Sequence, residues 1–66
     1  MKVILNQNTV EVNSNNLEEL LIEKDLINKK GIAIALNQSV VSKSNWSNTP
    51  LKENDNIMVI TATQGG

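Results

Sequence analysis

The start of the chain has two short segments rich in apolar residues, separated by a polar segment. Residues 2–5, Lys-Val-Ile-Leu, predict a short strand, and the polar residues Asn6-Gln7-Asn8 after them predict a turn. Residues 9–12, Thr-Val-Glu-Val, alternate between polar and apolar positions as a second strand does. Two short strands around a polar turn predict an N-terminal β-hairpin.

The period changes to that of a helix after the polar residues 13–16. Asn16 is a candidate N-cap, and Glu19 stands three residues later, in the position that completes a capping box. The apolar face of the helix is formed by Leu17, Leu20 and Leu21. We expect the helix to end near residues 25–28, with Lys29-Lys30-Gly31 as stop signals.

The second half of the chain predicts three more strands joined by polar turns. The expected elements are a strand at 32–36, a turn at 37–39, a short strand from Val40, a 3₁₀ turn around Trp46 within 44–48, a tight turn at 52–56 and a last strand at 57–62. Within the tight turn, Asn54 is the residue best able to adopt a left-handed backbone.

This order of elements predicts an α+β protein with the β-grasp (ubiquitin-like) fold. We expect a mixed sheet of four to five strands with one main helix packed on one face. Residues 1–66 would form a single β-grasp domain, with residues 64–66 as a flexible C-terminal tail. The expected core is Val3, Leu5, Val10, Val12, Leu17, Leu20, Leu21, Ile34, Leu36, Val41, Leu51, Ile57 and Val59.

Composition excludes several classes of function. The chain has no Cys and no His, so a disulfide framework, a thiol nucleophile, the commonest general base and the usual zinc ligands are all absent. Six Lys, no Arg, a net charge of −1 and one aromatic residue give no platform for nucleic acid. No apolar run approaches the length that spans a membrane, and we expect a cytoplasmic protein that binds no metal. The chain is therefore not expected to be an enzyme in its own right.

The residues Gln64-Gly65-Gly66 are the strongest candidate for chemistry. Two terminal glycines without side chains can enter a narrow channel and present the Gly66 carboxylate to another protein's active site. A Cβ at either position would widen the tail and restrict its backbone. The alternative is an ordinary exposed terminus with no role.

The last strand offers a second candidate site. If Ile57 and Val59 point into the core, the other face of the sheet carries Met58, Ile60, Ala62, Ala33 and Ala35. Such a mildly apolar face without a covering helix fits a partner docking surface. It fits equally well the ordinary exposure of apolar side chains on an antiparallel sheet.

Three further features have simpler structural explanations. Trp46 more plausibly closes the edge of a small core than binds a ligand. Lys29-Lys30 could meet an acidic partner, but two lysines before a glycine are more often a helix stop. The carboxylates Glu18, Glu19 and Glu23 have the spacing of a solvated helix face and lack the geometry of a metal site.

Three segments together resemble one protein family. They are residues 2–6, Lys-Val-Ile-Leu-Asn; residues 34–41, Ile-Ala-Leu-Asn-Gln-Ser-Val-Val, with Trp46 five residues beyond; and residues 51–57, Leu-Lys-Glu-Asn-Asp-Asn-Ile, with the final strand and Gly65-Gly66. With the β-grasp pattern they make the chain similar to the ubiquitin-like sulfur carriers, and among these to the ThiS family of thiamine biosynthesis. The chain departs from that family at Ser42-Lys43, often Pro-Arg there, and at Asn54-Asp55, usually Gly-Asp.

The resemblance implies a protein co-substrate whose functional group is the Gly66 carboxylate. An adenylating enzyme (ThiF-like) would activate that carboxylate with ATP, and sulfur from a persulfide donor would convert it to a thiocarboxylate. A thiazole synthase (ThiG-like) would then receive the sulfur. The chain itself would hold no cofactor, would carry the sulfur only as the C-terminal thiocarboxylate, and would be a monomer when free.

Three other functions share the features of this sequence. The small subunit of molybdopterin synthase donates sulfur from the same kind of tail, although that family is typically longer. A ubiquitin-like modifier would join Gly66 to lysines of other proteins. A plain binding module would have an inert terminus, and deletion of Gly66 would separate it from the carriers, because only the carriers lose all function.

Overall fold

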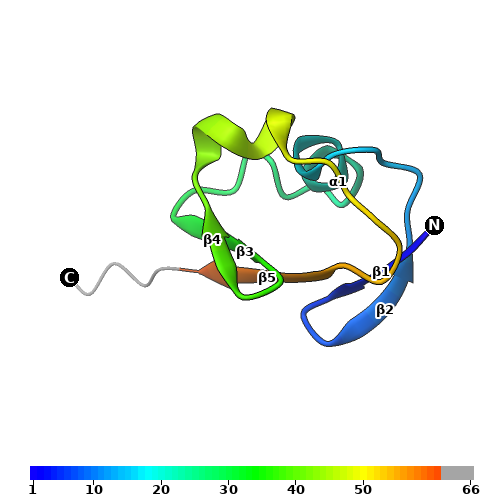
Figure 1. Cartoon of the computed structure of the whole chain (residues 1–66). Coiled ribbons are helices and arrows are strands. Elements are labelled where there is room, and N and C mark those ends of the chain that lie inside the picture. Colours follow the sequence, from blue (N-terminus) through cyan, green and yellow to red (C-terminus); the bar gives the residue numbers. More distant parts are fainter. Residues whose placement is uncertain (62–66) are drawn as a thin grey trace.

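The sheet has five strands, and the last strand of the chain lies at its centre. The computed structural model describes residues 1–61. Its elements are β1 (Lys2–Leu5), β2 (Asn8–Glu11), α1 (Leu17–Glu23), β3 (Ile32–Leu36), β4 (Ser39–Val41), the 3₁₀ helix η1 (Lys43–Asn48) and β5 (Asn56–Thr61). The strand order is β2-β1-β5-β3-β4, with β1 and β5 parallel and the other neighbours antiparallel. Figure 1 shows α1 and η1 over one side of this sheet. The predicted β-grasp fold is confirmed.

Both hairpins close through a two-residue turn that begins with an asparagine. Asn6 and Asn37 have φ values of 49° and 51°, and the glutamine after each also has a positive φ. Two successive positive φ values define the type I′ turn, whose twist suits a two-residue hairpin loop. Because each turn is shorter than expected, Asn8 and Ser39 already pair in the sheet. The strands β2 and β4 therefore each begin one residue before their predicted starts.

The predicted helix start is confirmed. The Asn16 side chain accepts a hydrogen bond of 2.8 Å from the backbone N–H of Glu19. The Glu19 carboxylate in turn reaches back to the N–H of Asn15 at 2.9 Å, one residue before the cap. This reciprocal arrangement satisfies two backbone donors at the helix start.

The predicted helix end is wrong, because the helix stops at Glu23. Asp25 adopts a left-handed conformation with φ 60°, and its N–H bonds the carbonyl of Ile22 at 3.1 Å. The N–H of Leu26 bonds the carbonyl of Leu21 at 2.7 Å. These two bonds form a Schellman motif, which satisfies the last carbonyls and turns the chain away. Among residues 1–61, no helix is long and apolar enough to cross a membrane.

The core lies between α1 with η1 and the covered face of the sheet. Its buried members are Val3, Val12, Leu17, Leu20, Leu21, Ile34, Trp46, Leu51 and Ile57. The other expected core residues, Leu5, Val10, Leu36, Val41 and Val59, are half-buried and pack against this cluster. Trp46 closes one edge as expected, with 3% of its surface exposed and its indole N–H donating to the Val41 carbonyl at 3.0 Å.

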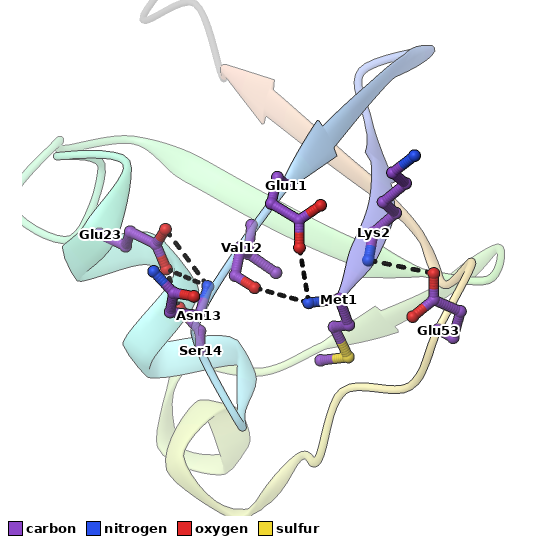
Figure 2. A network of polar contacts seen from close by, with 8 residues as sticks. All are labelled: Met1, Lys2, Glu11, Val12, Asn13, Ser14, Glu23 and Glu53. Carbon is purple, nitrogen blue, oxygen red and sulfur yellow. Dashed lines mark hydrogen bonds and ion pairs between the residues drawn. The ribbon is translucent and has the colours of Figure 1, made fainter.

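Polar contacts connect the first two residues of the chain to β2 and to the turn before β5 (Figure 2). The Met1 amino group forms an ion pair with the Glu11 carboxylate at 2.8 Å and donates to the Val12 carbonyl at 3.0 Å. The Lys2 N–H bonds the Glu53 carboxylate at 3.2 Å. The hydrogen bond between Met1 and Glu11 raises the pKa of the amine and lowers the pKa of the carboxyl.

A second set of contacts in Figure 2 ties the end of α1 to the segment before it. The Glu23 carboxylate accepts hydrogen bonds from the Ser14 hydroxyl and from the Asn13 N–H, the latter at 3.1 Å. The Ser14 hydrogen bond is the largest influence on Glu23 and lowers the pKa of its carboxyl. Ser14 is itself buried, so this contact also satisfies a buried hydroxyl.

Candidate partner-binding site on the sheet

The central strand β5 is the element that positions both candidate sites. It pairs with β3 along the register from Leu36↔Ile57 to Ile32↔Thr61 and with β1 over Ile4↔Asn56 and Leu5↔Ile57. Thr61 is its last residue and the last one described. The predicted tail residues Gln64, Gly65 and Gly66 lie outside the described residues, as does Ala62.

Asn6, at the end of β1, extends the pairing of β5 with its side chain. Its backbone N–H donates to the Ile57 carbonyl at 2.9 Å. Its side-chain carbonyl then accepts from the Val59 N–H at 2.9 Å. The amide side chain thereby takes the place of the next residue of β1, which has already turned into the hairpin.

Asn37, which follows β3, holds the start of β5 in the same manner. Its backbone N–H donates to the Asn56 carbonyl at 2.7 Å, and its side-chain carbonyl accepts from the Asn56 N–H at 2.9 Å. Its side-chain NH₂ donates to the Asp55 carboxylate at 3.1 Å, and Asp55 also accepts from the Lys52 N–H at 2.7 Å. Asn54, at φ 69°, provides the left-handed turn before it, as predicted. The start of the last strand is thus fixed by its hydrogen bonds on one side and by a turn on the other.

The face of the sheet away from α1 contains a hollow of about 290 Å³, here called the sheet-face hollow. Its lining residues are Ala35, Gln38, Val40, Asn56, Met58 and Ile60. Met58 and Ile60 each expose 44% of their surface, whereas Ala35 exposes only 9%. Ala35 pairs with Met58, so the small side chain lies low between larger neighbours. Ala33 is half-buried and pairs with Ile60 at the adjoining position.

The structure therefore brings together Met58, Ile60, Ala33 and Ala35 on one face. Sequence reasoning missed Val40, which is 73% exposed and pairs with Ala35 across β3 and β4. The sequence could have indicated this position. Val41 is an expected core residue, and since adjacent residues of a strand point to opposite faces, Val40 belongs on the uncovered face.

The sheet-face hollow has the composition of a recognition surface. Its only polar side chains are the amides of Gln38 and Asn56. None of the described residues that line it has a titratable or nucleophilic side chain. Across residues 1–61 there is also no group of three or more side chains suited to hold a metal ion. An apolar face with a polar margin is typical of a surface that contacts another protein.

The helix carboxylates are used for structure. Glu19 completes the helix cap, and Glu23 binds Ser14 and Asn13. Both side chains are exposed, whereas Glu18 is half-buried. The prediction of a solvated face therefore holds for Glu19 and Glu23.

The fold and the exposed sheet face define a β-grasp domain of the ubiquitin-like class. Within that class the chain belongs to the ThiS family, whose model matches residues 3–66. The crystal structure of the thiamine biosynthesis protein ThiS from Geobacter metallireducens is similar over 100% of both chains, with a TM-score of 0.86 and 22% identity.

A solution structure of a thiamine biosynthesis protein from the same organism is also similar. It has a TM-score of 0.76 and 22% identity, over 100% of this chain and 88% of the other. At this identity the two likenesses establish the fold. Comparison of the sequence with curated proteins gives no match.

Proposed function

We propose that this chain is a sulfur carrier protein for formation of the thiazole moiety of thiamine. The observation that carries the proposal is the match of the ThiS family model, which includes Gly65 and Gly66 at the end of residues 3–66. The name of the similar protein from Geobacter metallireducens, a thiamine biosynthesis protein, supports the same role. The chain acts as a protein co-substrate, and the catalytic groups belong to its partners.

The chemistry begins at the Gly66 carboxylate. One carboxylate oxygen attacks the α-phosphorus of ATP in a ThiF-like enzyme, and pyrophosphate leaves. The resulting acyl-adenylate carries AMP as a good leaving group, which the carboxylate itself lacks. A persulfide sulfur attacks the carbonyl carbon and displaces AMP. Attack by a thiolate then cleaves the sulfur–sulfur bond, which leaves a thiocarboxylate on Gly66 and a disulfide on the donor side.

The thiocarboxylate then delivers its sulfur to a ThiG-like thiazole synthase. ATP is consumed in the ThiF-like enzyme, so the carrier needs no resident cofactor. What the carrier supplies is recognition and a tail narrow enough to enter another protein's active site. We propose that the sheet-face hollow, with Met58 and Ile60 at its rim, is where the ThiF-like enzyme docks. Its apolar surface on the strand that leads towards Gly66 supports this assignment.

Intact-protein mass spectrometry tests the carrier role. The chain is incubated with MgATP, the ThiF-like enzyme of the same genome and a persulfide donor. We expect a mass gain equal to the exchange of one oxygen for sulfur, and no gain in a variant lacking Gly66. Addition of the ThiG-like enzyme together with the substrate that accepts the sulfur should return the carboxylate mass. An unchanged mass in the presence of an enzyme that demonstrably adenylates another carrier contradicts the proposal.

Two single substitutions on opposite sides of the molecule test the docking face. Ile60 on β5 and Ile22 on α1 are both exposed, at 44% and 57%. Ile60→Gln and Ile22→Gln should each change the free energy of unfolding by less than about 0.5 kcal/mol, as exposed substitutions usually do. Only Ile60→Gln should weaken binding to the ThiF-like enzyme, by about tenfold in Kd for a contact near the interface centre. Equal affinities for the two variants would place the contact elsewhere.

A further inference from the structure

A second hollow, of about 360 Å³, lies at the covered side of the sheet. Three of the six lysines of the chain line it, and it is here called the lysine hollow. Its lining residues are Ile27, Asn28, Lys29, Lys30, Gly31, Ile32, Lys43 and Trp46. Two of the lysines come from the connection between α1 and β3, and Lys43 comes from the start of η1. No Asp or Glu lines this lysine hollow, although the chain has seven acidic residues.

Helix termination does not account for Lys29 and Lys30. The helix ends at Glu23 through the Schellman motif at Asp25, and both lysines lie beyond that motif. Within this connection the backbone N–H of Lys29 donates to the Leu26 carbonyl at 3.1 Å. Their side-chain charges therefore have no part in ending the helix.

The charges of the lysine hollow are also not neutralised by the fold. Within residues 1–61, the ion pair between Met1 and Glu11 is the only one within 4.0 Å. Three ammonium groups around one concave surface add their potentials and attract carboxylates, since a hollow in a low-dielectric body concentrates the field. The indole N–H of Trp46 is already bonded to Val41, so the attraction comes from the lysines.

The lysine hollow lies at the end of the sheet from which the chain continues towards Gly66. Ile32, one of its lining residues, pairs with Thr61, the last residue of β5. The neighbouring pair, Ala33↔Ile60, reaches the sheet-face hollow on the other side. Each hollow therefore includes a residue at the end of the β3–β5 pairing from which the chain continues towards Gly66.

We propose that the lysine hollow binds an acidic segment of the adenylating enzyme, an inference that rests on the proposed function. Exposed lysines bind a free anion weakly, because water and salt screen each pair. A carboxylate segment on an enzyme already held at the sheet face arrives at a high effective concentration, and three weak pairs then add to an existing interface. Lys43 would contribute a point charge to this contact.

Two triple variants of equal charge provide the test. The first replaces the hollow lysines, K29Q, K30Q and K43Q, and the control replaces the other three, K2Q, K24Q and K52Q. Each lowers the net charge from −1 to −4, because three positive charges are removed. Pyrophosphate release by the ThiF-like enzyme with MgATP is then measured as a function of carrier concentration. Circular dichroism establishes that both variants are folded.

We expect the hollow variant to raise KM for the carrier about tenfold at about 0.05 M salt, with kcat unchanged. The control variant should raise KM less than about twofold, and the difference should shrink near 0.5 M salt because surface charges are then screened. Equal KM values for the two variants overturn the inference while leaving the carrier role intact. A second result would also overturn the inference. In that case KM of the hollow variant is unchanged, and addition of inorganic phosphate to the wild-type chain shifts the NMR signals of Gly31 and Ile32. The hollow would then bind a small anion. If the wild-type chain itself is not adenylated, the proposed function fails first.

Discussion

The turn residue Asn37 should contribute a large share of the stability of this small domain. Its side chain makes two hydrogen bonds, to the Asn56 N–H at 2.9 Å and to the Asp55 carboxylate at 3.1 Å. Its backbone φ of 51° is one that asparagine tolerates better than residues with a larger or non-polar side chain. Replacement by glycine removes the two bonds and keeps the backbone, whereas replacement by alanine removes the bonds and also strains the backbone.

The magnitudes follow from these two terms. Two net hydrogen bonds of about 1 kcal/mol each give a loss of about 2 kcal/mol for Asn37→Gly. A Cβ in the left-handed region costs about 1–2 kcal/mol, partly offset by the lower chain entropy of unfolded alanine. We therefore expect a loss of about 3 kcal/mol for Asn37→Ala. At about 0.05–0.15 kcal/mol per residue, 66 residues have a total stability of about 3–10 kcal/mol, so at the lower end of this range the alanine variant should approach the limit of folding.

Urea unfolding followed by the fluorescence of Trp46 measures both values. Work near 15 °C keeps the alanine variant close to its temperature of greatest stability. Asn28→Ala is the matched control, because Asn28 is exposed and its side chain makes no hydrogen bond within residues 1–61; it should change stability by less than about 0.5 kcal/mol. A glycine variant as stable as the wild type would refute the role of the side-chain bonds. Equal stabilities of the glycine and alanine variants would refute the backbone term.

Two further predictions concern the edges of the core. Because hydrogen bonds from Ser14 and Asn13 lower the pKa of Glu23, the carboxylate stabilises the fold above the unfolded pKa, near 4.5, and loses this effect as the pH falls through the folded pKa. The Tm of Glu23→Gln should therefore lie below that of the wild type at pH 7 and approach it at about pH 3, whereas a constant difference would exclude the linkage. Trp46→Phe should cost about 2 kcal/mol in urea unfolding followed by circular dichroism, since the Val41 carbonyl loses its 3.0 Å donor and the smaller ring leaves a void. A loss below about 0.5 kcal/mol would show that the edge of the core repacks around the smaller ring.

Local chemistry made much of this fold predictable from the sequence. The cap at Asn16, the left-handed turn at Asn54 and the buried face of α1 all depend on residues close in sequence, and all three agree with the structure. The end of the helix was misjudged because Asp25 is a less common residue than glycine in the left-handed position after a helix. The residues Lys29-Lys30-Gly31 beyond it are a more common signal for the end of a helix.

Contacts between distant segments were not predictable from local patterns. The side chain of Asn6 bonds the N–H of Val59 only because β5 is placed beside β1 in the sheet order. In the sequence, Asn6 is one of many turn residues, and nothing distinguishes it. Likewise, Lys43 joins Lys29 and Lys30 only because η1 passes next to the connection from α1 to β3.

The position of β5 relates the small core to the two surfaces that we propose for partner binding. Ile57 is buried in the core and Val59 packs against it, whereas Met58 and Ile60 are exposed on the uncovered face. The sheet-face hollow is lined by residues of β5, and the lysine hollow reaches β3 at Ile32, which pairs with Thr61 at the end of β5. A partner that binds both the sheet-face hollow and the lysine hollow would fix the direction in which the chain leaves the sheet. The hydrogen bonds from Asn6 and Asn37 hold β5 in register, so the geometry of the sheet-face hollow depends on the two hairpin turns.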